Sequence, residues 1–335
     1  MDPVAALREI AYLMERVLAD PRRVRAFRTA ADAVAALPGA EFDRHAAAGS
    51  WKELPGVGES TSAVIAQAVA GRVPDRLATL RAEAGPLAVG GEALLEALRG
   101  DLHTHTDWSD GGSPIERSKE AATALGHEYL AITDHSPRLT VANGLTAERL
   151  ELQLARIAEL NESDGCRLLT GIEVDILLDG GLDQTSAMLD RLDVVVASVH
   201  SELRMPSEPM TARMVGAIAN PHTNILGHCT GRLITGGRGT RPQSTFDAEV
   251  VFEACRQYDV AVEINSRPER ADPPDDLLTL ALETGCLFAI DSDAHAPGQL
   301  EFPAHGAARA VAAGIPAERI VNTWPLPDLL AWTRA

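Results

Sequence analysis

Two patterns of hydrophobic positions divide the chain into a helical first part and a second part of alternating strands and helices. Residues 1–99 are rich in alanine, and apolar residues recur at helical spacing over residues 7–18. A second helix is predicted over residues 23–37. Residues 53–71 predict two helices joined by a tight Pro-Gly-x-Gly turn, and residues 85–99 predict a linker with one short helix.

From residue 100 onward, short apolar runs rich in β-branched residues alternate with helical stretches. The seven candidate strands are 101–104, 129–133, 168–174, 193–199, 224–226, 260–264 and 287–290. This alternation implies parallel strands joined by right-handed crossovers, and continuous apolar runs are typical of a sheet that is buried on both faces. We therefore predict an α/β fold, with a closed barrel over residues 100–335 preceded by a small all-α domain.

Six of the seven candidate strands end in side chains that can bind a metal ion. The nine candidate ligands are His103, His105, Asp110, His135, Glu173, His200, His228, Asp293 and His295. A single histidine at a strand end is usually structural. In an α/β barrel, however, the carboxyl ends of the strands build the active site, and six such ends indicate a shared centre. The sixth strand ends in Glu263-Ile-Asn265, which is polar but less informative.

The predicted donors are imidazoles and carboxylates without a thiolate, a set that suits Zn²⁺, Mn²⁺ or Fe²⁺. Nine ligands are too many for one ion, so two to three divalent ions with a bridging carboxylate are expected. Such a cluster can hold phosphoryl oxygens and lower the pKa of a bridging water. No Ser-His-Asp order and no phosphate-binding Walker loop is found, so the sequence predicts metal-dependent hydrolysis of a phosphate ester.

The net charge of −18 is unevenly distributed along the 335 residues. Residues 1–99 hold 12 Lys and Arg against 13 Asp and Glu, whereas residues 100–335 hold 18 against 35. An acidic second part argues against a broad nucleic-acid footprint there and fits a carboxylate-rich metal site. Simple solubility would explain the same excess, so charge alone does not separate the two interpretations.

The composition predicts a cytoplasmic protein without a membrane partner. The N-terminus lacks the basic region and cleavage site of a signal peptide, and no apolar run approaches the roughly 20 residues that span a bilayer. The four cysteines are Cys166, Cys229, Cys255 and Cys286. Because no two of them form a C-x-x-C pair, we expect reduced, packed thiols.

Six motifs along residues 100–333 resemble the successive motifs of the PHP (polymerase and histidinol phosphatase) family. They are DLHTHTDWSDG, ITDHS, GIEVDI, ASVH, ILGHCTGR and DSDAH. The resemblance implies a distorted (β/α)7 barrel with three metal ions. It places His103, His105, Glu173 and Asp293 around one ion, Glu173 with His200 and His228 around a second, and Asp110, His135 and His295 around a third. An Asp at position 110, where stand-alone phosphatases often have His, resembles the branch fused to DNA polymerases.

Within the family, the chain is most similar to the PHP part of bacterial family X DNA polymerases, in the phrases ITDHSPRLTVANGL, EINSRPERAD and VNTWPLPDLLAW. Residues 1–84 resemble the helix-hairpin-helix domain that opens those polymerases, and this implies DNA binding. The arginines of residues 22–28 favour DNA binding, whereas the neutral charge of this part favours a helical packing domain without DNA contact.

The catalytic palm and fingers of those polymerases have no counterpart here, because the linker 85–99 joins the two parts directly. We therefore expect no nucleotidyl transfer. Ser60 and Val64 occupy the places where lyase relatives carry lysine nucleophiles, so we also expect no Schiff-base chemistry.

Three further residues are predicted to act in catalysis. Phosphoryl transfer needs cationic groups for the non-bridging oxygens, and Arg232 and Arg267 are the favoured donors, ahead of Arg138 and Arg270. Asp134 is expected to orient His135 or its neighbours, as carboxylates commonly do beside metal-bound imidazoles.

Three functions are compatible with these features. The favoured hypothesis is hydrolysis at DNA ends in DNA repair, by a 3′-phosphatase or a 3′–5′ exonuclease. The alternative is a small-molecule phosphomonoesterase, such as a histidinol-phosphate or nucleotide phosphatase. A DNA-tethering module with a structural metal site is the third possibility, and the complete ligand set argues against it.

Overall fold

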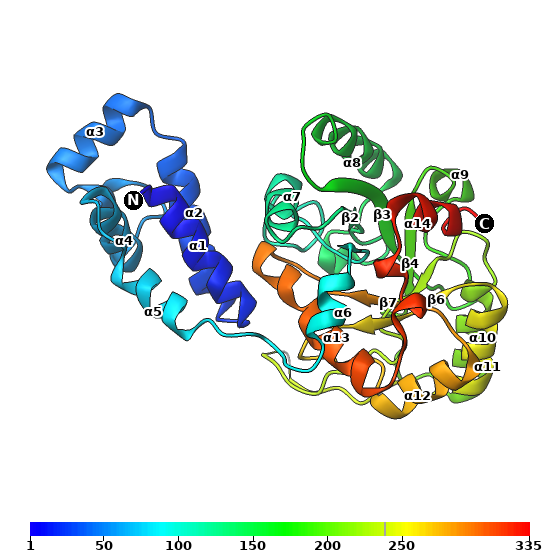
Figure 1. Cartoon of the computed structure of the whole chain (residues 1–335). Helices are drawn as coiled ribbons and strands as arrows, with labels where there is room; N and C mark the ends of the chain where they lie inside the picture. Colours follow the sequence, from blue (N-terminus) through cyan, green and yellow to red (C-terminus); the bar gives the residue numbers. More distant parts are fainter. Residues whose placement is uncertain (238) are drawn as a thin grey trace. The chain divides into compact units, whose positions relative to one another are not determined.

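The computed structural model describes residues 1–237 and 239–335, which form two compact units, Met1–Pro86 and Leu87–Ala335 (Figure 1). The first unit is entirely helical. Its elements are α1 (Pro3–Arg16), α2 (Pro21–Ala35), α3 (Gly39–Ala48), the 3-10 turn η1 (Trp51–Glu53), α4 (Glu59–Val69) and α5 (Asp75–Glu83). A core of buried aliphatic and aromatic side chains, among them Leu7, Ile10, Phe27 and Ile65, holds these helices together.

Local sequence determines where the helices of the first unit begin and turn. Asp2 and Asp20 cap α1 and α2 by accepting backbone N–H groups, and each is followed by a proline in the first turn. In the turn before α4, Gly56 has φ +81°, and a Cβ on it would lie 2.4 Å from Thr29 Cγ2. The Pro-Gly-x-Gly turn therefore requires glycine at this position.

The second unit contains seven strands. They are β1 (Gly100–Asp101), β2 (Tyr129–Ile132), β3 (Arg167–Asp175), β4 (Val194–Ser198), β5 (Ile225–Leu226), β6 (Ala261–Asn265) and β7 (Phe288–Asp291). They pair in parallel in the order β1-β2-β3-β4-β5-β6-β7. Beyond the two end strands, Thr104 and Ala294 form a parallel bridge, and the His105 N–H donates to the Ala294 carbonyl at 2.7 Å. The sheet thus closes at its carboxyl end, which confirms the predicted seven-stranded barrel.

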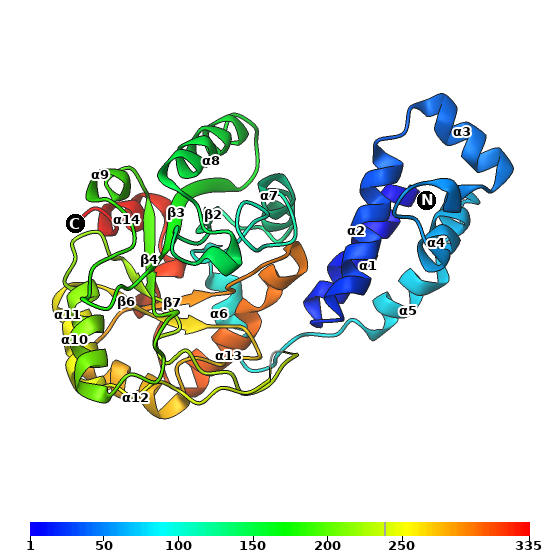
Figure 2. The ribbon, with the colours of Figure 1, turned by 180° about the vertical axis from the view of Figure 1, so that it is seen from behind.

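Helices and 3-10 turns surround the outside of the sheet (Figures 1 and 2). They are α7 (Ile115–Ala124), η2 (Thr140–Ala142), α8 (Ala147–Leu160), α9 (Ser186–Leu189), α10 (Ser207–Ile218), α11 (Ala248–Gln257), α12 (Asp275–Thr284), η3 (Pro297–Glu301) and α13 (Pro303–Ala312). Those from α7 to α12 lie between successive strands, whereas η3 and α13 follow β7. One core lies between these helices and the sheet, and it includes Ile172, Val195, Phe252 and Ile290. The continuous apolar runs in the sequence reflect this burial on both faces.

The C-terminal segment packs against the inner residues of the barrel. It contains η4 (Ala317–Arg319), η5 (Val321–Thr323) and α14 (Leu326–Trp332). Its buried Val321 and Leu329 belong to one cluster with the strand residues Leu102, Val196 and Ala289. The polar strand ends at the carboxyl side remain available for a site.

Most of the segment that we expected as a linker lies in the second unit. It carries α6 (Glu92–Ala97), whose Leu94 belongs to the main core. A Cβ on Gly91 would lie 2.4 Å from the backbone nitrogen of Ala308 on α13, so the chain passes directly against that helix. Across the described residues, no helix is long and apolar enough to cross a membrane. All four cysteines are free and buried, as predicted.

Candidate metal centre

Glu173 of β3 lies at the centre of a cluster of histidines at the carboxyl end of the barrel. It is 1% exposed, and no described group forms a hydrogen bond with either carboxylate oxygen. Five imidazoles approach these two oxygens instead. The nitrogens are His135 Nδ1 at 2.7 Å and the Nε2 atoms of His228, His200, His103 and His105 at 2.9, 3.3, 3.4 and 3.6 Å.

These spacings fit divalent cations between the donors. Two atoms that each lie about 2.0–2.2 Å from one ion are about 2.8–3.1 Å apart at octahedral angles and about 3.3–3.6 Å apart at tetrahedral angles. His103 Nε2 and both ring nitrogens of His105 are buried without a hydrogen-bond partner among the described residues. Unpartnered buried polar atoms cost free energy unless another group satisfies them. A cation held by these lone pairs would do so.

The remaining predicted ligands join the same cluster. Asp110 Oδ1 lies 3.5 Å from His135 Nε2 and 3.4 Å from His295 Nε2, and Asp293 Oδ1 lies 3.5 Å from His105 Nε2. Three groups have ligand atoms that all lie within 4.8 Å of one another: His105, Asp110, His135 and His295; His103, His105 and Glu173; and His135, Glu173 and His200. All nine candidates therefore lie together. Their assignment to individual ions stays a prediction.

The electrostatics of the cluster favour an anionic Glu173 among neutral and charged imidazoles. Burial raises the pKa of Glu173, but the charges of His200, His103 and His135 outweigh it and hold this pKa well below its ordinary value. Burial and the neighbouring His295 and His135 lower the pKa of His105 to about 3. His105 is therefore a neutral Lewis base at physiological pH.

His200 differs from His105, because the carboxylates of Glu173 and Asp175 outweigh its burial and raise its pKa to about 9. A metal ligand must give up the proton on its coordinating nitrogen. Cation binding at His200 would therefore release a proton and weaken as the pH falls.

Two carboxylates outside the predicted ligand set contact the rings of these histidines. Glu263 Oε1 lies 2.5 Å from His103 Nδ1, and Asp175 Oδ1 lies 2.5 Å from His200 Nδ1. Neither residue is among the predicted ligands or catalytic residues. The available signal was an acidic residue at or near the end of a buried strand, on β6 for Glu263 and on β3 for Asp175.

Asp134 has partners other than His135. Its carboxylate accepts from the Thr106 N–H at 2.8 Å, from Thr106 Oγ1 at 2.6 Å, from Gln153 Nε2 at 2.6 Å and from Ser109 Oγ. Successive side chains of an extended segment point to opposite sides, so Asp134 faces away from the neighbouring histidine. It anchors the loop that follows β1 and that carries His105 and Asp110.

The two favoured arginines bond to backbone carbonyls. Arg232 donates through Nε to the Arg270 carbonyl at 3.1 Å and through Nη2 to the Ala271 carbonyl. Arg267 donates through Nη1 to the Asp293 carbonyl at 2.7 Å, and the same nitrogen lies 3.2 Å from His295 Nδ1. These contacts hold the loops after β5, β6 and β7 together, and among the described residues neither arginine bonds to the oxygens of Glu173.

Arg270 and Arg138, the two less favoured arginines, have different surroundings. Arg270 is 8% exposed, and its Nε lies 3.2 Å from Asp293 Oδ2. The side chain of Arg138 is 67% exposed and lies beside Asp183. Arg270 is therefore a buried guanidinium that forms an ion pair with the carboxylate of a predicted metal ligand.

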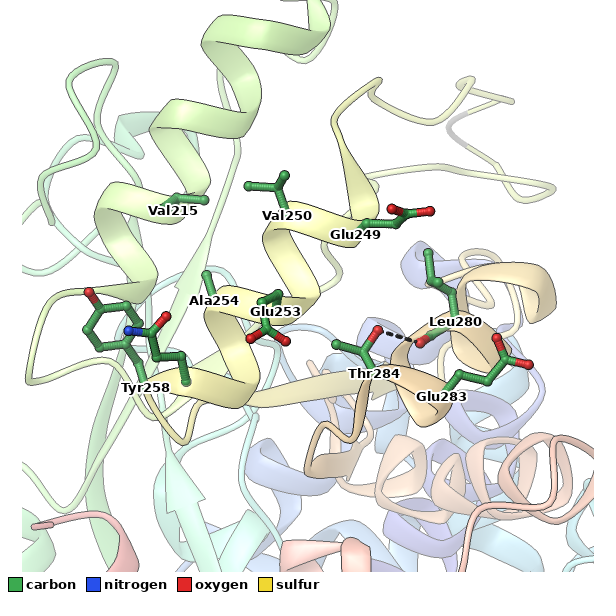
Figure 3. A pocket seen from close by; sticks show the side chains of 10 residues that line it. Val215, Glu249, Val250, Glu253, Ala254, Tyr258, Leu280, Glu283 and Thr284 are labelled. Carbon is green, nitrogen blue, oxygen red and sulfur yellow. Dashed lines mark hydrogen bonds between the residues drawn. The ribbon is translucent and has the colours of Figure 1, made fainter.

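A hollow of about 770 Å³ on the outer surface holds none of the nine candidate ligands (Figure 3). It lies between α10, α11 and α12, and Val250, Glu253, Tyr258 and Leu280 line it. This hollow is therefore separate from the metal cluster.

Comparisons with known proteins match both parts of the chain. The Helix-hairpin-helix domain family matches residues 1–73, and the PHP domain family matches residues 101–267. The DNA polymerase/3′-5′ exonuclease PolX of Bacillus subtilis (strain 168) is 39% identical over 241 residues, which are 72% of this chain and 42% of that protein. The chain therefore spans less than half of this relative.

Shorter relatives are matched over most of their length. The probable phosphatase Teth514_1060 of Thermoanaerobacter sp. (strain X514) is 30% identical over 207 residues, which are 58% of this chain and 78% of that protein. Among solved structures, the histidinol phosphate phosphatase of Lactococcus lactis subsp. lactis Il1403, complexed with zinc, L-histidinol and phosphate, is 18% identical. It covers 65% of this chain and 94% of that chain, with a TM-score of 0.47.

Proposed function

Because the chain belongs to the PHP family, we propose that it hydrolyses phosphate esters at DNA ends, as a 3′-phosphatase or a 3′–5′ exonuclease in DNA repair. Membership confirms the predicted resemblance and makes the chain a metal-dependent phosphoesterase. One observation carries the choice of DNA: a helix-hairpin-helix domain precedes the PHP domain in the same polypeptide. The PolX relative from Bacillus subtilis, which is named a 3′-5′ exonuclease, supports the same substrate class.

Some residues of the barrel would bind the cations, and others would bind the phosphate ester. Two to three divalent ions, Mn²⁺, Zn²⁺ or Fe²⁺, would supply a hydroxide nucleophile and Lewis-acid stabilisation of the phosphoryl oxygens. The nine clustered ligands would hold these ions around the carboxylate of Glu173. Arg270, buried beside Asp293, can donate to a non-bridging oxygen of the substrate. Arg267 would hold the loop of Asp293 and His295 in place through its contacts with the Asp293 carbonyl and with His295 Nδ1.

The first unit offers groups that suit DNA phosphates. Arg22, Arg23 and Arg25 lie exposed at the start of α2, and the structure as described gives them no ion pair. Helix α4 begins at Glu59, directly after the glycine turn, so its first N–H groups and its dipole favour an anion. These features support backbone contact without base readout.

A comparison of two substrates tests the proposal. The full-length, Mn²⁺-loaded protein is incubated with a 3′-phosphorylated gapped duplex and with histidinol phosphate, and kcat/KM is compared. We expect a large preference for the duplex. A large preference for histidinol phosphate would overturn the DNA assignment and favour the small-molecule phosphatase, an alternative supported by the match to 78% of the probable phosphatase.

A variant tests whether the arginines of the first unit bind the DNA substrate or only stabilise the fold. Replacing Arg22, Arg23 and Arg25 together by alanine should lower kcat/KM on the duplex at low salt and leave turnover of a small phosphomonoester unchanged. The reason is that phosphate contacts act through charge and weaken with salt. An equal loss on both substrates would mean that these arginines serve the fold.

A further inference from the structure

The sixth strand supplies a buried carboxylate that touches the metal cluster without belonging to the predicted ligands. Glu263 of β6 is 0% exposed. Its Oε1 lies 2.5 Å from Nδ1 of His103, and its Oε2 accepts from the backbone N–H of His228 and, at 3.2 Å, from Nδ2 of Asn265. One carboxylate therefore contacts segments that follow two different strands, β1 and β5.

This arrangement determines which nitrogen of the His103 ring carries hydrogen. Oε2 accepts from two N–H donors, and the oxygens of a carboxylate accept hydrogen bonds without donating any. His103 Nδ1 must therefore carry a hydrogen. His103 Nε2, which has no hydrogen-bond partner and lies 3.4 Å from Glu173 Oε1, is then the nitrogen that can bind a cation.

We propose that Glu263 is a positioning residue of the metal centre, which fixes His103 in the tautomer whose Nε2 is free to coordinate. Hydrogen bonds from carboxylates to metal-bound imidazoles orient the ring and raise its basicity. The proposal rests on the metal centre of the proposed function, but it holds whichever phosphate ester is the substrate.

A second carboxylate–imidazole pair lies at the same cluster. Asp175 Oδ1 lies 2.5 Å from Nδ1 of His200, whose Nε2 lies 3.3 Å from Glu173 Oε1. The side chain of His200 is 14% exposed, whereas that of His103 is 0% exposed. Water can replace a lost partner of His200 more readily than a lost partner of His103, so Glu263 has the larger effect of the two.

The substitution Glu263→Gln distinguishes positioning from mere packing, because the amide keeps the size but presents one acceptor and one donor. If its oxygen faces the His228 N–H, its NH₂ group meets His103 Nδ1, which must then accept. The hydrogen moves to Nε2, and that nitrogen can no longer coordinate. If its oxygen faces His103 instead, the NH₂ group opposes the N–H of His228. Neither orientation preserves all the contacts.

The test measures metal binding and ring protonation in the full-length protein. The Zn²⁺-loaded protein, labelled with ¹⁵N-histidine, should show a slowly exchanging Nδ1–H on His103, identified from its loss in His103→Gln. Zn²⁺ affinities are obtained by chelator competition and ion counts by mass spectrometry. Glu263→Gln should weaken one ion by about 10- to 100-fold and leave the others bound.

Two further variants define the outcome. Glu253→Gln, on the exposed face of α11, is the matched control and should change nothing, and Asp175→Asn should weaken a different ion. A wild-type His103 that carries its hydrogen on Nε2, or a folded Glu263→Gln that retains every ion at full affinity, would overturn the proposal. If Glu263→Gln fails to fold, the wild-type spectrum alone decides. Loss of the DNA activity without a change in these readouts would concern the substrate assignment only.

Discussion

Replacing Arg213 by methionine should strongly destabilise the second unit and disturb the metal centre. Arg213 of α10 is 1% exposed and is the largest fully buried side chain described. Its guanidinium donates to the carbonyls of Ile176 and Ser201 at 3.0 and 2.8 Å and to the Leu177 carbonyl at 3.1 Å. These three carbonyls lie in the segments that directly follow Asp175 and His200.

The magnitude follows from the carbonyls that lose their donor. Methionine fills most of the apolar volume of the arginine stem, so the main effect is electrostatic. The buried Ile176 carbonyl loses its donor, the Ser201 carbonyl belongs to an exposed residue, and the Leu177 carbonyl keeps the N–H of Gly180. Each buried carbonyl left without a donor costs about 1–3 kcal/mol, and water at the loop edges lowers the sum. A loss of about 2–4 kcal/mol is expected, which lowers Tm by about 10 °C in a unit of this size.

Calorimetry of the full-length protein measures this loss, with and without Zn²⁺. Arg191→Met is the matched control, because Arg191 is 49% exposed and pairs with the exposed Glu151, and such pairs contribute at most about 1 kcal/mol. The Arg213 variant should also bind Zn²⁺ more weakly, since both loops carry residues of the centre. A variant that melts within about 2 °C of the wild type would show that these hydrogen bonds do not hold the loops.

Three further predictions concern other buried groups. Glu173→Gln removes the carboxylate on which five imidazoles converge, and mass spectrometry should find at least one ion fewer per chain with the fold retained in circular dichroism. Burial lowers the pKa of His127 from 6.5 to about 4. Between pH 6.5 and pH 4 the unfolded state therefore binds more protons than the folded state, so the free energy of unfolding should fall by about 2–3 kcal/mol over this range. Urea titrations of His127→Gln should show a weaker fall. All four thiols are buried, and burial raises the pKa of Cys166 and Cys286 to about 12, so a thiol reagent should react only on unfolding.

The clustering of the nine candidate ligands could be predicted because each lies at or after the end of a strand that is evident from local sequence. The run 287–290 predicted the strand observed as β7 (Phe288–Asp291), and Asp293 and His295 follow it directly. Once the strands are parallel, their carboxyl ends meet, and His103 and Asp293 come together across 190 positions of sequence. Errors of one or two residues at a strand boundary do not change which end carries the ligand.

The contacts of the supporting residues could not be predicted, because they depend on loop conformation and on side-chain direction. Arg232 and Arg267 lie in loops whose carbonyls accept their hydrogen bonds, and loop geometry is not encoded in apolar periodicity. Asp293 adopts φ +50°, a left-handed conformation that sets the direction of its loop. The role of Glu263 depends on the register of β6 against its neighbours, which places its two oxygens beside His103 and the His228 N–H.

Burial divides the acidic excess of the second part between the surface and the interior. Among the described residues of that part, eight acids are buried: Asp101, Asp134, Glu173, Asp175, Glu263, Asp272, Asp291 and Asp293. The buried cationic side chains are four: Lys119, Arg213, Arg267 and Arg270. Burial holds the pKa of Asp291 well above its ordinary value, so this carboxyl keeps a proton. With the imidazoles neutral, as metal binding requires, three formal negative charges remain inside. Solubility does not explain charges that water cannot reach. Two divalent cations carry enough positive charge to balance them, so the charge of the interior supports the proposed centre of two to three ions.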